Sequence, residues 1–131
     1  MTETINHPKH YNTHPSMVEC IDLIEWLGTN RGSAVKYLWR KDDKGKPKQD
    51  ADKALWFTSR EVQRLKKYRL HWSFCDEIPT EIEAAFEKWK AFEPDGWRKD
   101  VVCLIWEGHS THLQKAVDIL ATEVHRMSPD A

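Results

Sequence analysis

Residues 50–69 read DADKALWFTSREVQRLKKYR, and this stretch indicates the fold most directly. Small and apolar residues recur along it at intervals of three and four, which places them on one side of an α-helix. Asp50 is suited to cap the start of that helix. The spacing predicts an amphipathic helix of about five turns, the longest element of the chain. Its inward stripe is predicted to be Ala51, Ala54, Leu55, Thr58, Val62, Leu65 and Arg69.

The sequence before this stretch predicts two shorter helices. Ser16 is followed three residues later by Glu19, which is the pattern of a capping box, and apolar residues at helical spacing continue to a stop at Gly28. Residues 29–32 predict a turn, and Ser33 is suited to cap a second helix that ends before a polar loop at 42–49. The inward residues of the second helix are predicted to be Val35, Leu38 and Trp39.

The sequence after it predicts three further helices. Thr80 and Glu83 form another capping-box pattern, and a break at 94–96 separates this helix from the next. The next helix runs from about Trp97 to Glu107 and ends at Gly108. The apolar stripe of the first of these helices is Ile82, Ala85, Phe86, Trp89 and Phe92. The apolar stripe of the last helix is Leu113, Val117, Leu120 and Val124.

The amino-terminal residues do not show helical spacing. Pro8 and Pro15 disfavour a regular helix in residues 1–15, which therefore predict an extended arm. No segment shows the strict alternation of a half-buried strand. We therefore expect an all-α fold, a compact bundle of about six helices with an extended N-terminal arm, forming a single domain over residues 1–131.

Composition narrows the classes of function. A chain of 131 residues with 40% hydrophobic content can bury one substantial core. The formal net charge of -1 argues against strong nucleic-acid binding, which needs a basic field. Cys20, Cys75 and Cys103 are too widely spaced to suggest a disulfide framework or a zinc site. With no membrane-spanning run and no signal peptide, we expect a soluble cytoplasmic protein.

Two cations on the second predicted helix are candidates for phosphate binding. Lys36 and Arg40 are four residues apart, so their side chains share a face and can converge on one anion. Gly32 and Ser33 lie where the predicted loop meets the helix, and free N–H groups at a helix N-terminus attract negative charge. No GxxxxGK[ST] pattern is present, so the site is not a P-loop. The alternative is that both cations are solvated surface charges.

Histidines in the N-terminal arm form a second candidate group. His7, His10 and His14 lie within eight residues, a spacing that can bind zinc when a helix brings the rings together. The two prolines oppose such a helix. Hydrogen bonding to a phosphate or a base, with Tyr11 stacking nearby, is the more economical role. Packing of these rings against the bundle is the alternative.

Carboxylates and a further cation complete the candidates. Glu19 and Asp22 lie on one face of the first predicted helix, where they could hold Mg²⁺, orient the cations or bind a sugar hydroxyl, or could simply form structural ion pairs. Basic residues also recur along residues 53–67, a pattern more typical of the wet side of a helix, and only Lys53 joins the site. Among the tryptophans, Trp39 and Trp56 are nearest to it.

Ordered motifs run through residues 5–65, about half of the chain. They are Asn6-His7-Pro8-Lys9-His10-Tyr11, Glu19-Cys20-Ile21-Asp22, Gly32-Ser33-Ala34-Val35-Lys36-Tyr37-Leu38-Trp39-Arg40, Lys44-Gly45, and Asp50 with Lys53-Ala54-Leu55-Trp56. In these motifs the chain resembles a phage-encoded family described as SaV-like, formerly a domain of unknown function, which includes a coliphage nucleoside monophosphate kinase. Ser33 stands where that family usually has Asn. In this interpretation residues 1–70 are the family region and residues 76–131 a C-terminal helical extension.

The resemblance implies phosphoryl transfer from a nucleoside triphosphate to a deoxynucleoside monophosphate, without a P-loop. Any Mg²⁺ in this reaction would be brought in by the nucleotide. Lys36 and Arg40 would be the catalytic cations. The residues implied to bind substrate are His7, His10, Tyr11, Glu19, Asp22, Gly32, Ser33, Lys44, Asp50 and Lys53. A homo-oligomer in the cytoplasm of the host cell is expected, because a shallow site on a small bundle can need a neighbouring subunit.

Two hypotheses without catalysis stay open at the level of the sequence. The same site could sequester a signalling nucleotide of a host defence system, because binding and transfer require the same residue types. Alternatively, the tryptophan-rich helices could contact a host protein, in which case no nucleotide would bind. Measurement of turnover distinguishes nucleotide sequestration from a kinase. Measurement of nucleotide affinity distinguishes the host-protein hypothesis from both, because it predicts no nucleotide binding.

Overall fold

The structure is a computed structural model that describes residues 14–42, 45–73 and 77–130. Within these residues the chain forms helices and no strand, so the predicted all-α class is confirmed. The helices are α2 (Cys20–Ile24), α3 (Thr29–Arg40), α4 (Pro47–Tyr68), α5 (Thr80–Phe92), α6 (Trp97–Glu107) and α7 (Ser110–Arg126).

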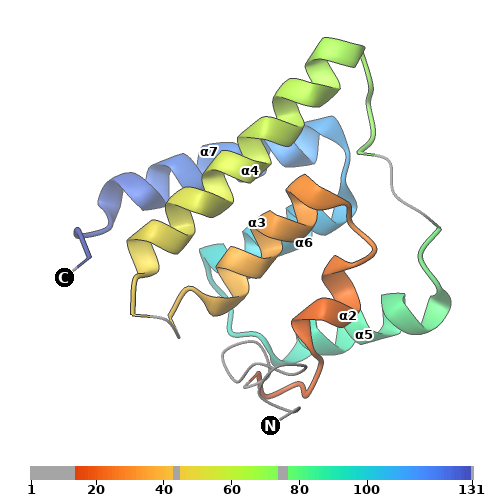
Figure 1. Cartoon of the computed structure of the whole chain (residues 1–131). Helices are drawn as coiled ribbons and strands as arrows, with labels where there is room; N and C mark the ends of the chain where they lie inside the picture. Colours follow the sequence, from red (N-terminus) through yellow and green to blue (C-terminus); the bar gives the residue numbers. More distant parts are fainter. Residues whose placement is uncertain (1–13, 43–44, 74–76, 131) are drawn as a thin grey trace, which may run out of the picture.

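The helices pack in layers (Figure 1). The long helix α4 lies beside α7, and beneath them α3 packs against α4 while α6 packs against α7 and α3. The short helix α2 contacts α3 on one side and α5 on the other. Helices from the two halves of the sequence therefore alternate in space, and α3 is covered by α4, α6 and α2.

One hydrophobic core draws residues from all six helices. Leu23, Leu38, Leu65, Ile105 and Leu113 are each almost completely buried. Such side chains contribute roughly 1.5–3 kcal/mol each when they leave water. Within the described residues, α5, α6 and α7 therefore share one core with α2, α3 and α4.

Tryptophan rings form the centre of the lower layers. Trp39 of α3 stacks on Trp89 of α5 with 5.7 Å between ring centroids. Phe86 lies between Trp89 and Trp106, at 5.7 Å and 4.4 Å. Offset stacking of this kind adds to the gain from burial alone. The expectation that Val35, Leu38 and Trp39 face inward is confirmed, since all three are buried.

The first helix is shorter than predicted. Helix α2 begins at Cys20, and Glu19, not Ser16, precedes it. Met17 has a φ of 65°, a left-handed conformation that interrupts a helix. The Ser16 hydroxyl instead accepts a hydrogen bond from the backbone N–H of Val18 at 3.1 Å. The predicted capping box at Ser16 was therefore wrong.

Helix α3 begins earlier than predicted. Gly28, with a φ of 80°, precedes the helix, which starts at Thr29 and includes Gly32 and Ser33. The Gly32 N–H donates to the Gly28 carbonyl at 2.8 Å, the i to i−4 bond of a helix. A Cβ on Gly32 would lie 3.0 Å from the Ile24 carbonyl oxygen. The predicted turn at 29–32 was wrong, and Gly32 serves close packing of α3 on the end of α2.

Helix α4 also starts earlier than the predicted Asp50 cap. Pro47 is its first residue, a position that suits the fixed φ of proline. The cap comes from a distant segment, because the Asp130 carboxylate accepts hydrogen bonds from the backbone N–H groups of Lys48 and Gln49 at 3.0 Å and 2.9 Å. Figure 1 shows the C-terminal segment beside the start of α4.

Downstream boundaries agree more closely with the predictions. Helix α6 spans Trp97–Glu107, and Gly108 follows it with a φ of 78°. Helix α5 begins at Thr80, which lies inside the helix and makes no side-chain cap. Of the predicted apolar stripes, Phe86 and Leu120 are buried whereas Phe92 is exposed.

A buried arginine ties the segment before α5 to the end of α6. The Arg31 guanidinium donates to the carbonyl oxygens of Ile105 at 2.9 Å, Trp106 at 2.7 Å and Ser73 at 3.3 Å. These carbonyls include the free acceptors at the end of α6, which need partners when they are buried. Arg31 therefore acts as a structural cap for α6.

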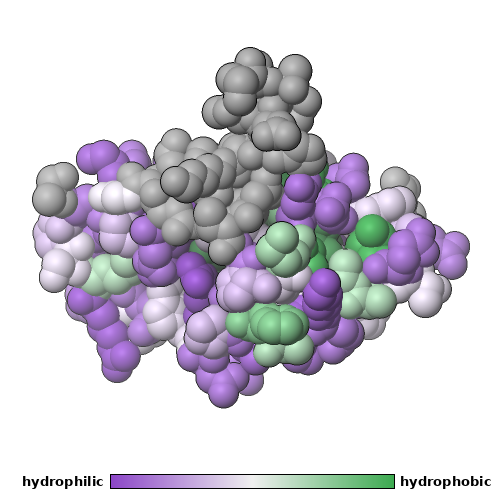
Figure 2. All heavy atoms as spheres, turned by 90° about the horizontal axis from the view of Figure 1, so that it is seen from below, coloured by the Kyte–Doolittle hydropathy of each residue, from purple (hydrophilic) through white to green (hydrophobic). Residues whose placement is uncertain are grey.

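One face of the molecule is mainly hydrophilic in its described part (Figure 2). Figure 2 shows the face seen from below, where hydrophilic residues cover most of the described part and hydrophobic residues appear in small groups between them. Among the described residues, no helix has the length and apolar character needed to cross a membrane.

Candidate functional site

Three cations from two helices gather around the ring of Tyr37. The Lys36 ammonium nitrogen and the Arg40 guanidinium carbon each lie 4.7 Å from the ring centroid. The Lys53 ammonium nitrogen lies 5.1 Å from it. Lys36 and Arg40 reach the ring from α3, and Lys53 reaches it because α4 packs on α3. A tyrosine ring attracts cations through its negative face, so Tyr37 helps to hold like charges close together.

A buried carboxylate fixes one of these cations. Arg40 Nη2 lies 3.2 Å from Asp50 Oδ1, with 16% and 2% of the two side chains exposed. Asp50 belongs to the first turn of α4 and is buried with it. The second carboxylate oxygen, Oδ2, is buried without a hydrogen-bond partner among the described residues. The ion pair joins the end of α3 to the start of α4 and holds the guanidinium beside Tyr37.

The two lysines of the cluster are half-buried, as Arg40 is. The chain of a half-buried lysine can pack while its ammonium group reaches water. Lys36 also lies close to Cys20 of α2. Burial raises the pKa of the Cys20 thiol to about 12, and the positive charge of Lys36 opposes that rise. Lys36 and Lys53 are therefore each partly open to solvent.

Aromatic rings continue from Tyr37 toward the surface of α4. Phe57 stacks on Tyr37 with 6.0 Å between centroids and an interplanar angle of 12°. Trp56 meets Phe57 edge to face, at 5.0 Å and 86°. Trp56 is 60% exposed although it is the largest side chain of the three. The cations therefore lie next to an aromatic surface that is open to solvent.

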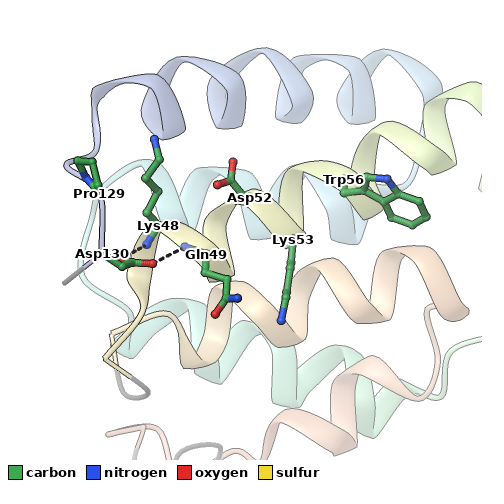
Figure 3. Close-up of a pocket in the computed structure, with 7 residues that line it drawn as sticks. All are labelled: Lys48, Gln49, Asp52, Lys53, Trp56, Pro129 and Asp130. Carbon is green, nitrogen blue, oxygen red and sulfur yellow. Dashed lines mark hydrogen bonds between the residues drawn. The ribbon is translucent and has the colours of Figure 1, made fainter.

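A pocket of about 500 Å³ lies along the start of α4 and includes Lys53 and Trp56 in its lining. Figure 3 shows that Lys53 points from α4 toward α3, whereas Lys48 points toward α7. The Lys48 ammonium group donates to the Val124 carbonyl at 3.0 Å, so it is committed to the packing of α7. Lys53 is thus the cation shared by this pocket and the Tyr37 cluster.

The other predicted substrate-binding residues lie elsewhere or outside the description. Glu19 precedes α2 and is half-buried, and Asp22 is exposed in the first turn of α2, the helix beside α3. Gly32 and Ser33 lie within α3 and form no anion-binding loop. His7, His10, Tyr11 and Lys44 lie outside the described residues.

His14, the last histidine of the predicted arm, packs into the bundle. Its ring lies 5.6 Å from Trp39 and 5.8 Å from Trp89. Its Nε2 lies 3.3 Å from Glu93 Oε1, and burial lowers its pKa although Glu93 opposes the shift. Packing of this ring against the bundle, one of the two expected roles, is what the structure shows. The described residues contain no group of three or more His, Cys, Asp or Glu that could hold a metal ion.

Tyr37 is the component that sequence reasoning did not place in the site. The sequence places it directly after Lys36 and three residues before Arg40, so both cations are its neighbours on a helix. An aromatic residue between two cations on one helix was therefore the sequence signal that could have placed Tyr37 in the site. Lys53 was predicted to join the site, but its place at this ring depends on how α4 packs on α3.

Comparison with known proteins adds one match. Residues 5–59 match the model of a family described as a protein of unknown function (DUF3310). No curated protein and no solved structure matches the chain. The matched stretch contains α2, α3 and the first part of α4, and therefore Lys36, Tyr37, Arg40, Asp50, Lys53 and Trp56.

Proposed function

We propose that this protein binds nucleotides, with the phosphates held by Lys36, Arg40 and Lys53. The single observation that carries the proposal is the gathering of these cations, from two helices, on the ring of Tyr37. Holding like charges close together is unfavourable unless an anion or a π-face compensates for it. A polyphosphate supplies several oxygen acceptors, and the planar guanidinium of Arg40 suits bidentate binding.

The reaction that we propose is phosphoryl transfer to a nucleoside monophosphate. An oxygen of the acceptor phosphate attacks the terminal phosphorus of a nucleoside triphosphate and forms a new P–O bond. The bond from that phosphorus to the bridging oxygen breaks, and the electron pair leaves with the nucleoside diphosphate. The acceptor is already an anion, so no strong general base is required.

The protein's contribution to this reaction is positioning and positive charge. Charge spreads over the oxygens of the transferred group in the transition state, and fixed cations stabilise it. Asp50 holds Arg40 in place through their 3.2 Å contact, so this guanidinium needs little reorganisation. Lys36 and Lys53 have no carboxylate partner among the ion pairs found in the described residues and would follow the phosphoryl group.

Magnesium would enter this site with the triphosphate. Asp50, the carboxylate that contacts Arg40, is buried and paired, so it does not fit a resident metal ligand. Mg²⁺ is commonly bound through phosphate oxygens and water, with few protein ligands. When bound, it would supply additional positive charge at the phosphates.

The test of the proposal is incubation of the purified protein with deoxynucleoside monophosphates and a nucleoside triphosphate, with and without Mg²⁺. Chromatography for new diphosphates measures turnover, and isothermal titration with each nucleotide measures binding. New diphosphates support the kinase. Binding without turnover would refute the transfer step and favour sequestration of a nucleotide, and no binding would refute the whole proposal.

Substitution of the cations tests the site itself. Lys36→Ala, Arg40→Ala and Lys53→Ala should each weaken binding about tenfold or more, as expected when a charge-assisted contact is lost. Lys66→Ala is the matched control, since Lys66 is an exposed lysine of α4 outside the cluster. Equal affinity for all four variants and the unmodified protein would exclude this cluster as the site. Light scattering on the same samples tests the expected homo-oligomer.

A further inference from the structure

An exposed tryptophan lies beside the cation cluster and is not explained by packing. Trp56 is 60% exposed, and burial of such a large side chain would normally be favourable. Its one ring contact is the edge of Phe57, at 5.0 Å and 86°, among the contacts described for it. The two rings meet edge to face, and more than half of the Trp56 side chain remains open to solvent, where a planar ligand can stack.

The neighbourhood of Trp56 favours a base over a phosphate. Asp52 lies one turn before it and lines the same pocket, as does Asp130, whose carboxylate caps α4. Lys48, the pocket's other cation, is bonded to the Val124 carbonyl. Two carboxylates would repel a phosphate placed against this part of the pocket, whereas a neutral base does not meet that repulsion.

The spacing of Lys53 and Trp56 along α4 suits a ligand that has a phosphate and a base. Lys53 precedes Trp56 by three residues, which is about 4.5 Å along a helix and nearly one turn around it. Lys53 also reaches the Tyr37 ring, where Lys36 and Arg40 lie. Because residues three apart are neighbours on a helix, a ligand with its phosphate at Lys53 can extend a ring, one sugar away, toward Trp56.

We infer that Trp56 is the base-binding residue of the site, on which the nucleobase stacks while Lys53 contacts the phosphate next to it. This inference rests on the proposed nucleotide binding and adds the residue that recognises the base. Every nucleobase has a π-face, so stacking on Trp56 supplies affinity for a nucleoside group and little discrimination among the four bases.

The experiment compares ligands that differ only in the base. Titration calorimetry measures the affinity of the full chain for a deoxynucleoside monophosphate and for 2′-deoxyribose 5-phosphate, which lacks the base. Trp56→Ala should weaken the nucleotide about tenfold, the size expected for loss of one stacked base, and leave the sugar phosphate unchanged. Trp56→Phe should recover most of the loss. Nucleotide binding should also quench tryptophan emission in the unmodified protein more than in Trp56→Phe.

Trp72→Ala is the matched control. Trp72 is 58% exposed and makes a similar edge contact, to His109 at 4.7 Å and 85°, but it lies beyond the other end of α4. Its loss should leave both affinities unchanged. Equal effects of Trp56→Ala on nucleotide and sugar phosphate would overturn the inference while leaving the phosphate cluster intact. A change in oligomeric mass in Trp56→Ala but not in Trp72→Ala would also overturn the inference, because it would show that Trp56 is a subunit contact. No binding of any nucleotide by the unmodified protein would overturn the inference and the proposed function together.

Discussion

Arg40 Nη2 lies 3.2 Å from Asp50 Oδ1, and this contact joins the last turn of α3 to the first turn of α4. Both side chains are largely withdrawn from water. A pair of this kind adds little net stability when complete, but removal of one partner leaves a charge poorly compensated. The contact therefore couples the geometry of the candidate site to the stability of the fold.

Loss of Asp50 should be costly for this reason. Asp50→Ala is expected to lower the free energy of unfolding by about 3 kcal/mol, the lower end of the range for breaking a buried pair. Urea denaturation followed by circular dichroism measures the change. Asp52→Ala is the control, because Asp52 is exposed on the same turns of α4 and should shift stability by less than about 0.5 kcal/mol. Similar values for the two variants would show that the buried pair is energetically unimportant.

Glu61 should make stability depend on pH in the acid range. Burial alone would raise the pKa of Glu61, but hydrogen bonds from Arg64, Ser73 and Asn30 lower it from an ordinary 4.5 to about 2. The folded pKa is below the unfolded one, so the stabilisation is complete above about pH 4.5 and is lost as the pH falls toward 2. The shift corresponds to roughly 3 kcal/mol at neutral pH.

Glu61→Gln tests this pH dependence. The variant should be less stable than the unmodified protein at pH 7, and the difference should shrink between pH 4.5 and pH 2. Denaturant unfolding at a series of pH values measures it. Ser73→Ala, which removes one of the three donors, should show an intermediate slope. Parallel curves for Glu61→Gln and the unmodified protein would contradict the lowered pKa.

Gly108 should not tolerate a side chain. It adopts a φ of 78°, and a Cβ there would lie 2.8 Å from Nη2 of the buried Arg31. Gly108→Ala should therefore cost more than the roughly 1 kcal/mol of left-handed strain, because Arg31 would also lose its carbonyl partners. A double-mutant cycle with Arg31→Ala separates the two effects, because only the clash depends on the guanidinium. Thermal unfolding should show a smaller loss for Gly108→Ala in the Arg31→Ala background than in the unmodified protein; equal losses would argue against a role for Arg31.

Tyr37 should contribute to ligand binding through its ring and not through its hydroxyl. Tyr37→Phe keeps the π-face and should change nucleotide affinity by less than about twofold. Tyr37→Leu removes the face that holds the cations and should weaken affinity about fivefold, equivalent to roughly 1 kcal/mol. Titration calorimetry measures both, with circular dichroism to check the helices. A Tyr37→Leu variant that binds like the unmodified protein would remove the ring from the site.

The parts of the fold that the sequence predicted are those governed by periodicity. The stripe through Ala51, Ala54 and Leu65 is buried, and α6 has the predicted bounds at Trp97 and Glu107. The helix starts were less predictable. Ser16 has the right neighbours for a cap, yet the left-handed Met17 interrupts the helix, and that conformation has no signal in the sequence.

The sequence predicted the cations of the candidate site, Lys36, Arg40 and Lys53, but not the ring that they share. The spacing of Lys36 and Arg40 indicates a shared face, and the structure shows both at Tyr37. Arrival of Lys53 at the same ring depends on the packing of α4 against α3, which no local pattern encodes. The burial of Arg31 could not be predicted from the sequence either, because a charged residue is seldom expected to be buried.

The cap that Asp130 places on α4 has a consequence for the order in which the chain is made. Asp130 follows Lys48 by 82 positions, so a nascent chain exposes α3 and α4 long before the residue that completes the first turn of α4 leaves the ribosome. That turn contains Asp50 and is followed at once by Lys53. The cap on this turn therefore forms only after α5, α6 and α7 have been synthesised, so the start of α4 depends on both halves of the sequence.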